Sequence, residues 1–148
     1  MARNREETTD VQENGVDETT SVLDLGLEDV PDETFVEGEQ RLRSIKPAKI
    51  HVSKESGKKS IALQLEVIDE PLAALIFHYQ AMPDPSDETR VANRKKRDLI
   101  AMCEAFGIEY SPLDLNAFDK GEAWANVTIT EDPQYGRQMR VQSFIVGA

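Results

Sequence analysis

The sequence predicts a mainly β domain with one helix, in the order β-β-β-α-β-β, preceded by an acidic segment. Three observations predict it. Apolar and polar residues alternate over 60–69, as in a strand with one buried face. Apolar residues over 88–106 instead recur with the period of a helix. The first 34 residues hold eleven acids against two bases and contain no aromatic residue.

The acidic segment accounts for most of the charge of the chain. Residues 1–34 sum to −9 of the net −11. Such a composition buries too little apolar surface to offset chain entropy, so we expect 1–34 to be an acidic disordered tail and 35–148 to be the domain. The stretch 22–30 alternates apolar residues with acids. It is either a short strand or turn packed on the domain, or a motif that docks into a partner protein through Val22, Leu23, Leu25 and Leu27.

Three strands are expected before the helix. The first covers 39–53 and is interrupted at Pro47, which suits a bulge or bend in an edge strand. A glycine turn over 54–59 leads to the strand at 60–69. The third strand covers 73–81, where two rows of side chains alternate. We expect the row with Phe77 and Tyr79 to face the core.

The helix over 88–106 should end at Gly107, where a glycine C-cap belongs, and should bury Cys103 on its apolar stripe. Two more strands, 122–130 and 137–146, flank a hairpin loop. Three strands, a helix and a hairpin are the order of the OB-fold, a five-stranded Greek-key barrel. A split β sandwich with one covering helix would have a similar order of strands and helix.

Several classes of function are disfavoured. The sequence has no run of 18 apolar residues and no apolar leader, so we expect no membrane span and a cytoplasmic location, in the host cell if a phage encodes the protein. One cysteine allows no internal disulfide and no multi-cysteine zinc site. No phosphate loop or nucleophile elbow is present. We expect no catalytic residues, metal or cofactor.

The second half of the sequence resembles a family of small bacteriophage proteins from replication and recombination modules. The resemblance covers about 36–146. It rests on the helix at 93–108 with its terminal Cys-Glu-Ala-Phe-Gly phrase, the turn at 118–121 before an alternating strand, and a closing hairpin with Tyr135-Gly136 and Phe144. It implies an OB-like protein that binds single-stranded DNA in phage replication or recombination.

Single strands are held by cations that track phosphates and by flat side chains that stack on bases. In an OB-fold, strands two and three and the first and last hairpins converge on one face. Nine of the fifteen bases of the domain fall on the first strand and these two hairpins. The candidate phosphate ligands are Arg41, Arg43, Lys46, Lys49, Lys54, Lys58, Lys59, Arg137 and Arg140. Each could instead be a solvated surface charge.

The candidate stacking residues are Tyr135 at the tip of the last hairpin, His78 and Trp124. Trp124 is more often a core residue. The helix also carries a basic cluster over 90–97, which is a solvated face, a docking site for the acidic tail, or a second contact with nucleic acid.

The leading hypothesis is therefore a sequence-tolerant single-stranded-DNA-binding protein. Its acidic tail would serve autoregulation or would recruit replication or recombination proteins. A phage structural or accessory protein is the alternative, and a DNA mimic is a third reading. The sequence leaves the oligomeric state open, with a homo-oligomer among the states it allows.

Overall fold

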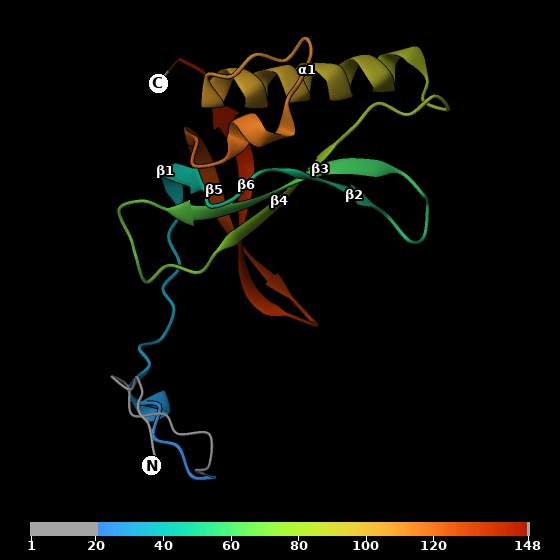
Figure 1. Cartoon of the computed structure of the whole chain (residues 1–148). Helices are drawn as coiled ribbons and strands as arrows, with labels where there is room; N and C mark the ends of the chain where they lie inside the picture. Colours follow the sequence, from blue (N-terminus) through green and yellow to red (C-terminus); the bar gives the residue numbers. More distant parts are fainter. Residues whose placement is uncertain (1–20, 148) are drawn as a thin grey trace, which may run out of the picture. The chain divides into compact units, whose positions relative to one another are not determined.

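The computed structural model describes residues 21–147 and shows one antiparallel sheet with a single α-helix among them (Figure 1). This confirms the mainly β class with one helix. The six strands are β1 (Gly38–Ser44), β2 (Lys49–Val52), β3 (Lys59–Val67), β4 (Ile76–Ala81), β5 (Glu122–Asp132) and β6 (Gly136–Ile145). The helix α1 (Thr89–Phe106) lies between β4 and β5.

The expected first strand is two strands, because the chain bends at Pro47. β1 pairs with β3 and with β5, whereas β2 continues along β3 after the bend. Proline lacks the N–H that a ladder needs, so strand pairing stops where the sequence predicted an interruption. The strand count is therefore six rather than five.

The sheet has Greek-key connectivity. β5 returns after the long connection through α1 to lie beside β1, and β1, β3 and β4 follow one another, which is the Greek-key order. β6 then extends the sheet beyond β5. In the described chain no ladder joins β4 to β6, so the sheet does not close into the expected barrel.

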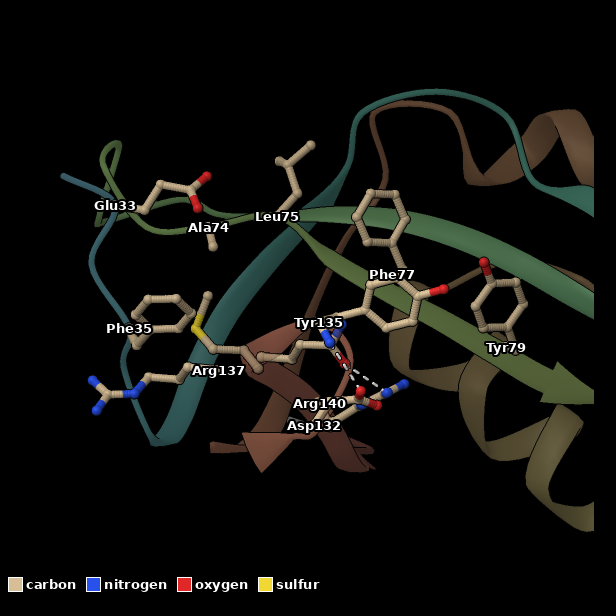
Figure 2. Close-up of a pocket in the computed structure, with 12 residues that line it drawn as sticks. Glu33, Phe35, Ala74, Leu75, Phe77, Tyr79, Asp132, Tyr135, Arg137 and Arg140 are labelled. Atoms are coloured by element: carbon tan, nitrogen blue, oxygen red, sulfur yellow. Dashed lines mark hydrogen bonds between the residues drawn. The ribbon is translucent and has the colours of Figure 1, made fainter. Parts of the chain in front are cut away.

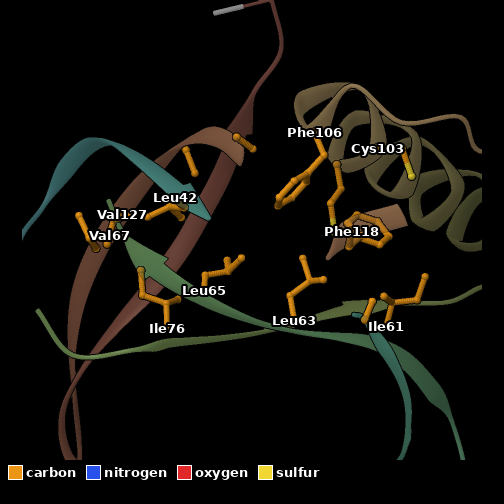
Figure 3. Packing of buried hydrophobic residues seen from close by; sticks show 14 of the residues in the cluster. Leu42, Ile61, Leu63, Leu65, Val67, Ile76, Cys103, Phe106, Phe118 and Val127 are labelled. Carbon is orange, nitrogen blue, oxygen red and sulfur yellow. The ribbon is translucent and has the colours of Figure 1, made fainter. Parts of the chain in front are cut away.

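The core lies inside the curved sheet (Figure 3). β3 alternates half-buried and buried side chains from Ser60 to Val67, and its inward row packs on Leu42 of β1. The helix covers one end with Met102, Cys103 and Phe106, all buried. Phe118, fully buried, meets Phe106 edge to face at 5.3 Å between ring centroids. Burial of each such side chain contributes about 1.5–3 kcal/mol.

Helix α1 ends as the sequence predicts. Gly107 adopts φ 71°, the left-handed conformation that glycine tolerates, and its N–H donates back to the helix at Glu104 O. The N–H of Ile108 donates to Cys103 O. This cap turns the chain toward the short 3₁₀ helix η2 (Leu115–Phe118), which places Phe118 in the core.

Residues 21–31 belong to an N-terminal unit, and the unit of the domain begins at Asp32. The described part of the N-terminal unit holds the 3₁₀ helix η1 (Leu27–Asp29) and no buried residue. The four candidate partner-binding residues are all exposed, namely Val22, Leu23, Leu25 and Leu27. Residues 1–20 lie outside the described residues, so disorder over 1–34 stays a prediction.

Candidate nucleic-acid interface

β4 presents its aromatic row to solvent, so the expectation that Phe77 and Tyr79 are core is wrong. Phe77 is 47% exposed and Tyr79 is 50% exposed. Pairing with β3 decides the orientation: Ile76 and His78 lie opposite the inward Leu65 and Leu63, and residues opposite each other share a face. Phe77 and Tyr79 therefore lie on the outer face of the sheet.

A large hollow of about 750 Å³ lies between β4 and the β5–β6 hairpin. We call it the slot. Leu75, Phe77 and Tyr79 line it from the β4 side, and Tyr135 and Arg140 are among the hairpin residues that line it (Figure 2). Among the described residues, no ladder joins β4 to β6, and residues of both strands line the slot. The slot is within the range of about 300–1,000 Å³ that is typical of small-ligand sites.

The tip of the hairpin is held by Asp132. Its Oδ1 accepts the backbone N–H groups of Tyr135 and Gln134 at 3.0 and 2.7 Å. These hydrogen bonds lower the pKa of the Asp132 carboxyl below its usual value, and the bond from Tyr135 has the larger effect. Gly136 follows at φ 78°, which only glycine adopts without strain. The turn leaves the Tyr135 ring 68% exposed at the slot.

The two hairpin arginines differ in their surroundings. Arg137 lies with its guanidinium 5.6 Å from the centre of the Phe35 ring, and its Nε is 3.3 Å from a Glu131 oxygen. Arg140 donates to the Gln138 amide oxygen at 2.7 Å and forms no salt bridge with any residue in 21–147. The slot also contains the carboxylates of Glu33 and Asp132.

A second, small hollow of about 70 Å³ adjoins the other side of Phe77 and Tyr79. We call it the furrow. Lys46 and Lys49 line it, together with Ala62 of β3. Neither lysine has a salt-bridge partner among the described residues. Slot and furrow thus bring four of the predicted cations to two sides of one aromatic ridge, and we call the whole surface the aromatic face.

The two arginines of β1 lie elsewhere, on a surface that we call the paired face. Arg43 donates to Glu66 at 2.7 Å, and Arg41 is ion-paired with Glu122. The cross-strand partner of Arg41 is Trp124, which is 36% exposed on the outer face of β5. No slot or furrow residue comes from this surface.

The three remaining predicted lysines, which come from the first hairpin, line neither hollow. The Lys58 Nζ lies 3.7 Å from Oδ1 of Asp87, and the Oδ2 of Asp87 accepts a hydrogen bond from Lys95 Nζ at 2.9 Å. Lys58 is therefore ion-paired with a residue just before the start of α1. Lys54 and Lys59 are exposed near the first hairpin and line neither hollow.

His78 faces inward. Its ring meets Phe144 of β6 edge to face at 5.2 Å, so the two side chains bridge the unpaired gap between β4 and β6. Burial lowers the pKa of His78, and a hydrogen bond with Gln80 opposes that shift. The other histidine, His51, was not among the predicted site residues, yet its ring lies 5.0 Å from that of Tyr79. One feature of the sequence indicates this position. His51 follows Lys49 by two residues, and this spacing places both side chains on the same face of β2.

Comparison with known proteins adds no family: no protein-family model matches the chain, and no curated protein matches it. The resemblance to phage replication proteins therefore stays an expectation.

Two further observations bear on other classes of function. No helix within 21–147 has the length and apolarity to cross a membrane. Cys103 is buried, and desolvation, aided by Glu104, raises the pKa of its thiol, which disfavours the reactive thiolate.

Proposed function

We propose that the domain binds single-stranded DNA on the aromatic face. The observation that carries the proposal is the exposure of Phe77, Tyr79 and Tyr135 around one slot, with cations on both sides. Exposed rings of this kind lose the benefit of burial in the free protein. Contiguous exposed apolar surface is typical of an interaction site.

Stacking on bases uses these rings directly. Base–aromatic stacking contributes about 1–3 kcal/mol per base, and every base has a face on which to stack. The three rings therefore support binding that tolerates many sequences. Tyrosines also offer a hydroxyl that stays in water while the ring stacks.

Phosphate contacts would come from Lys46 and Lys49 on one side and from Arg137 and Arg140 on the other. Against these four cations stand three carboxylates: Glu33 and Asp132 line the slot, and Glu131 is ion-paired with Arg137. The Asp132 carboxylate is already engaged by two backbone N–H groups. The cationic excess is modest, so affinity per domain would depend on stacking as much as on charge.

The biological setting follows from the resemblance alone. A protein of this kind would support phage DNA replication or recombination, in the cytoplasm of the host. The acidic segment at 1–34 would regulate binding or recruit replication or recombination proteins, with Val22, Leu23, Leu25 and Leu27 as contacts.

Fluorescence anisotropy with the full chain tests the proposal. A labelled dT oligomer of about 12 nucleotides is titrated at about 50 mM and about 200 mM salt. Four phosphate contacts on a single strand predict about a 50-fold loss of affinity over that range. A duplex of the same length should bind more weakly, because its bases are already stacked. Lack of binding at the lower salt, together with presence in purified virions, would favour a structural phage protein instead.

A further inference from the structure

The furrow has a shape that the register of three strands explains. Lys49 of β2, Ala62 of β3 and Tyr79 of β4 lie opposite one another on the outer face. His51, Ser60 and Ala81 form the next such row along the sheet.

The middle strand carries small side chains in both rows. Neighbouring strands are about 4.8 Å apart, so the side chains of β2 and β4 stand about 10 Å apart with only Ala62 or Ser60 between them. The result is a depression with an aromatic wall at Tyr79 and a cationic wall at Lys49.

Slot and furrow share their dividing ridge. Phe77 and Tyr79 line both hollows. His51 lies on β2, across β3 from Tyr79, and its ring meets that of Tyr79 at an interplanar angle of 56°. A nucleic-acid strand that leaves the slot across Phe77 and Tyr79 would therefore reach the furrow next.

We infer that the furrow is a second nucleotide subsite for the strand held in the slot. At about 70 Å³ it is too small to enclose a nucleotide. It therefore receives one edge of a base that stacks against Tyr79, while Lys46 and Lys49 hold the adjoining phosphate. The inference rests on the proposed function. It gives the interface a length of about four nucleotides or more, at the lower end of the range for one OB-fold.

Oligomers of two lengths test the inference. The slot alone should accept a dT oligomer of about three nucleotides, whereas one of about six reaches the furrow. A hexamer offers a trimer site four registers, so about fourfold tighter binding arises by statistics alone. One more stacked base adds about tenfold, so the wild type should bind the hexamer about 40-fold more tightly than the trimer.

Ala62→Leu fills the furrow and leaves the slot intact. This variant should bind the trimer as the wild type does and should gain only about the statistical fourfold with the hexamer. Ser143→Leu is the matched control, since it enlarges an exposed side chain on β6 opposite Asn126, away from both hollows. It should behave as the wild type.

Lys49→Gln gives an independent measurement. It should lower the slope of log affinity against log salt by about 0.7 for the hexamer and leave the trimer slope unchanged. If Ala62→Leu and Lys49→Gln both keep the wild-type hexamer affinity and salt slope, the subsite is overturned. The proposed function would still stand. Absence of binding by the wild type to oligomers of both lengths, and of about 12 nucleotides, would overturn both.

Discussion

The aromatic face and the paired face are built from the same kinds of residue and differ in what surrounds them. Each includes residues on the outer face of the sheet, and each combines at least one aromatic ring with cations. On the paired face, Glu122 and Glu66 neutralise Arg41 and Arg43. On the aromatic face, Lys46 and Lys49 have no such partner among the described residues.

The comparison shows that a count of basic residues is a poor guide to a cationic surface. An exposed ion pair contributes little to stability, about 0–1 kcal/mol, but it occupies the donors that a phosphate would use. Neither the slot nor the furrow is lined by a residue of the paired face. The two surfaces should therefore respond differently to the same substitutions.

The largest difference is expected for the rings. Phe77→Ala and Tyr79→Ala should each weaken binding of the dT oligomer by about 5- to 150-fold, since each removes one stacking surface. Trp124→Ala, on the paired face, should leave the dissociation constant unchanged. Anisotropy titrations of the three variants measure this. Equal losses for all three would remove the distinction between the faces.

A smaller difference is expected for the charges. The double variant Lys46→Gln/Lys49→Gln should reduce the salt slope of binding by about 1.4, which is two phosphate contacts on a single strand. Arg41→Gln/Arg43→Gln is the matched pair on the other surface and should keep the wild-type slope. A reduced slope in the arginine variant would mean that, in the wild type, the ion pairs of Arg41 and Arg43 break so that these arginines can contact DNA.

The comparison can also be reversed by freeing the paired arginines. Glu66→Gln/Glu122→Gln leaves Arg41 and Arg43 without carboxylate partners. Two free cations beside Trp124 should raise affinity at low salt by about two- to fivefold, in keeping with the small energies of exposed charges. The gain should vanish at high salt. A persistent gain, or none at low salt, would contradict the neutralisation argument.

The smallest effect concerns His78, whose ring lies on the inner face of the sheet behind the aromatic face. Burial lowers the pKa of His78 in the folded state, so the unfolded chain binds a proton first as pH falls below about 6.5. Stability from the neutral ring is present above that pH and is lost as pH falls toward the folded-state pKa.

Urea unfolding at several pH values between about 7.5 and about 5.5 measures this loss. His78→Gln should flatten the dependence of the unfolding free energy on pH. Ser143→Leu, the control variant on β6, removes no titratable group and should keep the wild-type dependence. An unchanged dependence in His78→Gln would mean that another group is responsible for it.

Much of the fold follows from local patterns. The alternation along β3, the helical period of α1 and the glycine after it all predict the elements that form, because each pattern reflects burial of one face. Pro47 indicated the interruption, although not that two strands result. Closure of the sheet was not predictable, since it depends on whether β4 and β6 approach within hydrogen-bonding distance.

The site was harder to predict for two physical reasons. Both rows of β4 contain large side chains, so the pattern does not decide which row faces inward; the register with Leu63 and Leu65 does. The ion pair of Arg41 joins residues 81 apart in the sequence. Neither a register nor a long-range pair is visible in a local window, whereas the loop-tip position of Tyr135 is.

The position of β1 in the middle of the sheet has a consequence for how the chain reaches its native state. β1 pairs with β5 from Gly38↔Val127 to Arg43↔Glu122, across most of the domain. Contacts so distant in sequence close slowly. A nascent chain that has emerged only as far as α1 holds β1 and its partner β3 but not β5, so the other side of β1 is an unpaired strand edge. β5 must therefore leave the ribosome before this edge is covered.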